Sequence, residues 1–139
     1  MDYRKFGSKY VLRLDKGDEI LESIGKFCQE NNIRLGSVTG IGAVDRAVIG
    51  LFETAKKKYH SREITGDMEI TSLVGNISSQ DGEVYLHLHI TLADSSLRAV
   101  GGHLNKAVIS ATGEIIIDTM EGQVDRKFCA EVGLNLLEF

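Results

Sequence analysis

The chain has 139 residues, a net charge of −4 and 42% hydrophobic residues, which is typical of one globular domain. The negative charge argues against autonomous nucleic-acid binding, because such affinity comes largely from Lys and Arg side chains that neutralise phosphates. No apolar run approaches the roughly 20 residues that span a bilayer, and the N-terminus lacks the apolar region of a signal peptide. We therefore expect a cytoplasmic protein without membrane contact, folded as a single domain over residues 1–139.

The N-terminal part of the sequence predicts one strand and then the only long helix. Residues 10–14 alternate apolar and polar side chains, as a half-buried strand does. Asp18 is a suitable N-cap, and Asn31-Asn32 ends the pattern, so we expect a helix near residues 18–30. The apolar stripe of this helix consists of Ile20, Leu21, Ile24, Phe27 and Cys28. Cys28 and Cys129 form no Cys-x-x-Cys pair, and we expect both to be buried free thiols.

Strand patterns dominate the remaining sequence. They cover residues 37–43, 47–52, 69–77, 84–92, 107–111, 114–119 and 134–139. Asp81-Gly82 predicts a hairpin between the third and fourth of these strands, and Thr112-Gly113 a break between the fifth and sixth. Gly40-x-Gly42 lacks the third glycine of a dinucleotide-binding loop, and a β-bulge explains it better. We predict an α+β fold, with a large, mainly antiparallel or mixed sheet and one principal helix packed on it.

His87-Leu88-His89 is the most informative local motif. Residues i and i+2 of a strand point to the same face, so the two imidazoles project together. His103 follows after a short polar loop, in Gly101-Gly102-His103, where the glycines permit close approach of another strand. This geometry allows the His103 side chain to lie over the strand face that carries His87 and His89. The alternative is a structural histidine beside a tight turn.

Three imidazoles without a thiolate suit zinc, and also nickel, cobalt or iron. Three protein ligands leave a fourth position open to water or substrate, as in catalytic zinc sites. Hydrolysis there requires a proton acceptor. Glu69 is the best-placed acid, because it lies on the strand expected to pair with the histidine strand, although an ion pair at the surface explains it equally well.

Four segments taken together resemble the plant and prokaryote conserved (PPC) domain, which also occurs in plant AT-hook nuclear proteins. These segments are residues 38–43, 69–77, 87–90 and 101–104, and the resemblance covers residues 4–138. It implies a stand-alone prokaryotic type that assembles as a homotrimer, with a metal site at His87, His89 and His103. It also implies that Glu69 and Asn76 occupy recurrent polar positions, which makes them candidates for a second shell or a ligand pocket.

Prokaryotic members of this family are often described as DNA-binding. In the plant proteins DNA contact belongs to a separate Arg-Gly-Arg-Pro element, and this chain contains no proline. The sequence therefore supports DNA binding only weakly. We expect a homotrimeric, zinc-binding module with a regulatory or ligand-binding role and a small-molecule ligand at the metal. The alternative is a metal-dependent hydrolase or lyase that acts at the open coordination position.

Overall fold

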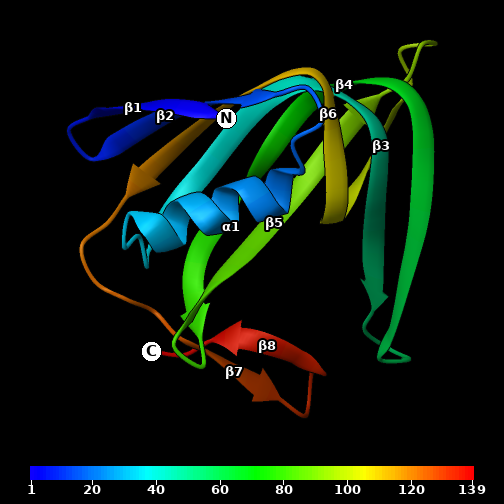
Figure 1. Ribbon diagram of the computed structural model, residues 1–139. Helices are drawn as coiled ribbons and strands as arrows, with labels where there is room; N and C mark the ends of the chain where they lie inside the picture. The colour runs from blue at the N-terminus through cyan, green and yellow to red at the C-terminus, as the bar shows by residue number, and fades with distance from the viewer.

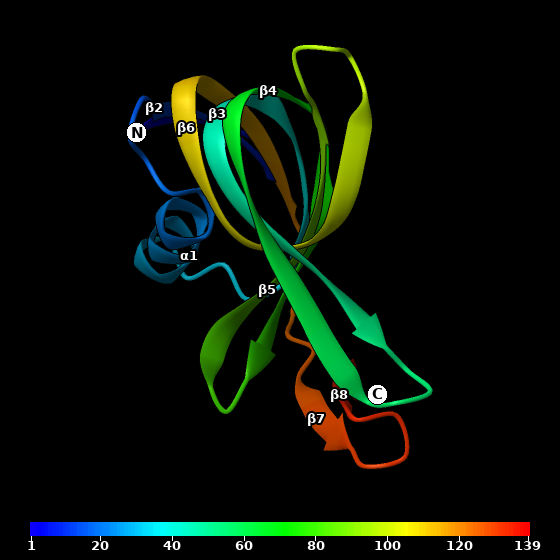
Figure 2. The same ribbon diagram turned by 90° about the vertical axis from the view of Figure 1, so that its right-hand side faces the viewer.

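The computed structural model describes residues 1–139 and consists mainly of one large antiparallel sheet (Figure 1). Six strands lie in the order β1-β2-β6-β3-β4-β5, and every pairing among them is antiparallel. The strands of this sheet are β1 (Asp2–Phe6), β2 (Lys9–Asp15), β3 (Gly36–Glu53), β4 (Lys58–Gln80), β5 (Glu83–Ala93) and β6 (Ala99–Thr119). The start of β6 also pairs with β5, so the sheet curves back on itself (Figure 2).

The expected α+β class is wrong, because strands hold 68% of the residues and the single helix, α1 (Ile20–Glu30), holds 8%. The physical reason is that several short strand patterns of the sequence join into single long strands. Thr112-Gly113 lies inside β6, and the two patterns at residues 37–43 and 47–52 are both parts of β3. Glycines and bulges let these long strands bend without breaking, as at the register shift between Gly40 and Gly42.

Helix α1 covers one face of the sheet and contacts β5 and β6 (Figure 1). Its buried residues are Ile20, Ile24, Phe27 and Cys28, as the apolar stripe predicts, and they join a core of 23 buried side chains. The N-cap is Glu19 and not the expected Asp18. The Glu19 carboxylate accepts hydrogen bonds from the backbone N–H of Glu22 and of Ala107 on β6, which attaches the helix to the sheet. No helix has the length and apolar character needed to cross a membrane.

The predicted hairpin between β4 and β5 is confirmed. Asp81 and Gly82 both have positive φ, at 53° and 83°, which matches the tight turns that favour Asp-Gly. The strand pattern at residues 134–139 does not join the main sheet. The C-terminal segment forms a separate hairpin of β7 (Arg126–Cys129) and β8 (Leu134–Leu137), seen at the bottom of Figure 1. A hydrogen bond from Ser79 N–H to the Val124 carbonyl holds the start of this segment against β4.

Candidate metal centre

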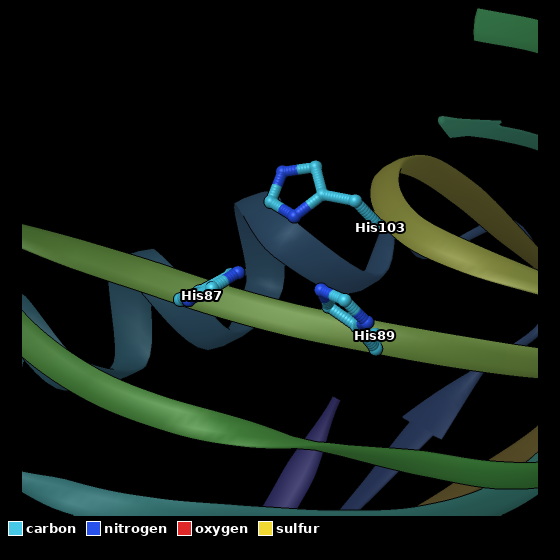
Figure 3. Close-up of side chains that lie close together, drawn as sticks. All are labelled: His87, His89 and His103. Carbon is cyan, nitrogen blue, oxygen red and sulfur yellow. The ribbon is translucent and has the colours of Figure 1, made fainter. Parts of the chain in front are cut away.

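Three histidines converge from β5 and β6 (Figure 3). His87 and His89 lie two residues apart on β5, with the buried Leu88 between them facing the core. His103 on β6 is directly opposite His89 in the register of the two strands. One ring nitrogen from each residue lies within 4.8 Å of the other two. Strand alternation and cross-strand pairing are therefore sufficient to assemble the cluster.

Glycines permit the close strand contacts around the cluster. A Cβ at Gly102 would lie 2.6 Å from the Gly50 carbonyl oxygen, and Gly50 is opposite His103 in the register of β3 and β6. A Cβ at Gly50 would in turn overlap the Tyr59 hydroxyl, which accepts a 2.6 Å hydrogen bond from the Asn105 amide. The absence of side chains at these two glycines therefore lets β3 approach His103 and leaves room for Tyr59.

The surroundings of the cluster favour neutral imidazoles. Burial lowers the pKa of His87, and the positive charges of Arg126 and the other two histidines lower it further. Burial is also the main cause of the lowered pKa of His103, with a smaller contribution from His89. Neutral imidazole carries the lone pair that a metal ion requires. The donor set at this site therefore fits a divalent transition metal.

The cluster forms part of the wall of a cavity of about 730 Å³. The cavity lies between the β3–β4 hairpin, the first parts of β5 and β6 and the β7–β8 hairpin. One part of its wall is apolar and contains Leu51, Phe52, Leu134, Leu136 and Leu137. Lys57 donates a hydrogen bond of 2.7 Å to the Ala130 carbonyl, so the turns of the two hairpins meet beside it (Figure 2). A volume of this size accommodates a small organic molecule.

Arg126, at the start of β7, is the charged residue of this cavity that the sequence interpretation missed. Its guanidinium donates to the Asn76 side-chain oxygen at 2.9 Å, the Ser78 hydroxyl at 2.8 Å and the Asn135 carbonyl at 3.1 Å. The central carbon of the group lies 4.7 Å from the centre of the Tyr85 ring. No local motif marks Arg126, because its position depends on the hairpin that follows residue 125.

The structure separates the two polar residues proposed beside the histidines. Asn76 lines the cavity and is opposite His87 in the register of β4 and β5. Glu69 is exposed, pairs with Ala93 and lines a different hollow that also contains Asp45 and Asp67. The fourth histidine, His60, is exposed and contacts Glu53. The cavity wall contains no Asp or Glu side chain.

Residues 1–121 match the Plants and Prokaryotes Conserved (PCC) domain, the domain that the sequence motifs resemble. The chain belongs to this family. The matched part includes all three histidines and excludes Arg126 and the β7–β8 hairpin.

The chain is also similar to proteins of known structure and to a curated enzyme. A solved candidate DNA-binding protein from Bacteroides thetaiotaomicron shares 36% identity and a TM-score of 0.97, over 99% of this chain and 96% of that one. A metal-containing protein from Archaeoglobus fulgidus shares 31% identity and a TM-score of 0.88, over 100% and 99% of the two chains. The bifunctional protein GlmU from Synechococcus is 29% identical over 121 residues, which are 85% of this chain but only 18% of GlmU.

Proposed function

We propose that this PCC-domain chain is a metal-binding module that holds one divalent ion through His87, His89 and His103. The observation that carries the proposal is the convergence of three ligand nitrogens within 4.8 Å of one another, at the wall of a cavity. The Archaeoglobus relative described as metal-containing supports it. Zinc is the proposed ion, because it accepts imidazole ligands in tetrahedral sites and tolerates an open position for water or a ligand.

A regulatory or ligand-binding role suits this cavity better than hydrolysis. Hydrolysis at an open metal position needs a general base within about 3 Å of the bound water or of the proton to be removed. The cavity offers no carboxylate for this role, and Glu69 lies in a different hollow. We therefore propose that a small molecule binds at the metal, and keep a metal-dependent hydrolase or lyase as the alternative.

We also propose that the chain assembles as a homotrimer. A row of exposed side chains crosses five strands at successive register positions, in the order Val11, Ile116, Thr39, Val74 and His89. The three apolar members of this row are 43%, 45% and 47% exposed. Contact between copies would remove this apolar strip from water, and closed symmetry would do so equally on every copy. The number three comes from the family resemblance.

DNA remains the less favoured partner. The argument for DNA binding is that the Bacteroides relative is described as a candidate DNA-binding protein. The net charge of −4 opposes it, because phosphate contacts require clustered Lys and Arg side chains. A gel-shift titration across a salt series tests this point, since binding through phosphates weakens steeply as salt increases.

Metal analysis of untagged protein tests the main proposal. We expect about one zinc ion per chain in the wild type, and loss of most of it in His87→Ala, His89→Ala and His103→Ala. His60→Ala is the matched control, because it removes an exposed imidazole outside the cluster. Equal metal content in the wild type and all four variants would contradict the proposal.

A further inference from the structure

We infer that Arg126 is the anion-recognition residue of the histidine cavity, and that the ligand is a small carboxylic acid with an apolar tail. This inference rests on the proposed metal-binding function and adds the chemical class of the ligand. Arg126 faces the same cavity as the three histidines. It belongs to a hairpin outside the family-matched residues 1–121.

The hydrogen bonds of Arg126 hold its guanidinium in place without neutralising it. All three acceptors are uncharged: an amide oxygen, a hydroxyl and a backbone carbonyl. Arg126 forms no ion pair, although eight contacts between a Lys, Arg or N-terminal amine and a carboxylate occur elsewhere in the chain. A positive charge that is fixed in a partly buried wall and has no counter-ion favours an anionic ligand.

The geometry also leaves donors for that anion. A guanidinium has five N–H groups, and the bonds to Asn76, Ser78 and Asn135 use one on each nitrogen. One N–H therefore remains on each of the two terminal nitrogens. These free N–H groups are able to donate to carboxylate oxygens, and such charge-assisted hydrogen bonds are short and strong.

The position of Arg126 connects it to the histidines. Its partner Asn76 is directly opposite His87 across β4 and β5. Tyr85, whose ring faces the guanidinium, is two residues before His87 and therefore on the same face of β5. Arg126 and the three histidines consequently face the same part of the cavity. A bound divalent ion would add positive charge to a wall that has no carboxylate, which strengthens the requirement for an anion.

The apolar wall defines the other end of the ligand. Leu51 and Phe52 from the β3–β4 hairpin line the cavity together with Leu134, Leu136 and Leu137 from β8. These side chains favour a hydrocarbon tail, because removing apolar surface from water stabilises the complex. A highly charged or fully polar ligand would leave this wall without a partner. The combination of fixed cation and apolar wall selects a monocarboxylate.

The test is calorimetric titration of the zinc-loaded protein with straight-chain carboxylates from acetate to octanoate, each compared with its neutral amide. We expect the preference for carboxylate over amide to decrease about tenfold or more in Arg126→Gln, consistent with hydrogen bonds to a charged group. Arg126→Lys should recover part of it. Lys127→Gln should keep it, since it removes the same charge from the same hairpin at an exposed residue that pairs with Glu138.

Unchanged carboxylate affinity in Arg126→Gln, or no carboxylate binding by the wild type, would overturn the inference. Stronger Arg126-dependent binding of inorganic phosphate than of every carboxylate would also overturn it. Metal content measured on the same samples separates the two proposals. Arg126-dependent carboxylate binding in protein that holds no metal would refute the metal proposal alone. Full metal content without carboxylate preference would refute this inference alone.

Discussion

Gly75 shows how a single missing side chain shapes the histidine site. A Cβ at this position would overlap the carbonyl oxygen of His87 and lie 2.8 Å from the Leu88 Cα. Both contacts are with the backbone of β5, so no side-chain rotation can relieve them. The glycine therefore determines how closely β4 approaches the strand that carries His87 and His89.

Gly75→Ala is expected to separate β4 from β5 and to destabilise the protein by about 1–3 kcal/mol, as overpacking does. Since His87 moves with β5, metal content should decrease as well. Chemical denaturation and metal analysis of the variant check both effects. Wild-type stability together with wild-type metal content would show that the two strands have more freedom than the contacts indicate.

Gly25 provides the matched comparison. It lies inside α1, where a Cβ would meet only the Leu86 side chain, at an ordinary 3.9 Å. Gly25→Ala should therefore stabilise the protein by about 0.5–1 kcal/mol, because glycine is an unfavourable residue within a helix. Chemical denaturation under the same conditions measures this change in stability. A loss of stability here would mean that the helix does not tolerate the added methyl group against β5.

The two cysteines should differ in reactivity. Burial raises the pKa of the Cys28 thiol to about 12, so almost none of the reactive thiolate exists near neutral pH. Cys129 on β7 is partly exposed. Iodoacetamide should therefore label Cys129 in the native protein and Cys28 only after denaturation, which peptide mass spectrometry resolves. Equal labelling of both cysteines in the folded protein would contradict this assignment.

At the scale of elements, α1 depends on one carboxylate for its attachment. The Glu19 carboxylate accepts hydrogen bonds from the backbone N–H of Glu22 at 2.7 Å and of Ala107 at 2.9 Å. The same side chain therefore caps the helix and connects it to β6. Glu19→Ala should destabilise the protein by about 1–3 kcal/mol, because it removes the cap and leaves a partly buried N–H without a partner. Thermal unfolding checks this, with the exposed Glu22→Ala as control. Equal effects of the two substitutions would argue against the capping role.

Local patterns predicted the parts of the fold that depend on short-range chemistry. The stripe from Ile20 to Cys28 predicted the helix, and Asp81-Gly82 predicted the β4–β5 turn, because periodicity and turn preferences act over a few residues. The length of β6 was not predictable in this way. Thr112-Gly113 has the composition of a turn, and only pairing with β2 and β3 keeps it extended.

The candidate site likewise contains residues that local patterns predict and residues that they do not. Strand alternation places His87 beside His89, and the glycines before His103 indicated close packing, so the cluster could be predicted from the sequence. Arg126 could not, since it reaches the cavity only through a separate hairpin held against the end of β4. Glu69 was proposed from strand pairing and from the family resemblance, but the register shift between Ile70 and Ser72 lies between it and the histidine pairings, and Glu69 lines a different hollow.

For the whole molecule, the apolar row that ends at His89 leads to a prediction about assembly. Ile116→Lys places a charge within that row, between Val11 and Thr39, so the proposed trimer should dissociate. Light scattering after size exclusion should give three times the chain mass of 15.3 kDa for the wild type and 15.3 kDa for the variant. Leu97→Lys is the control, because Leu97 is 85% exposed but lies outside the row. A wild-type mass of one chain would refute the trimer.

The order of the cavity residues along the chain has a consequence for how such proteins diverge. The three histidines lie within the matched residues 1–121, while Arg126 and the leucines of β8 come from a short tail after them. Insertion, deletion or replacement within this tail changes the charge and shape of one wall and leaves every imidazole in place. Metal affinity and ligand preference can therefore evolve separately, in a protein whose central sheet stays the same.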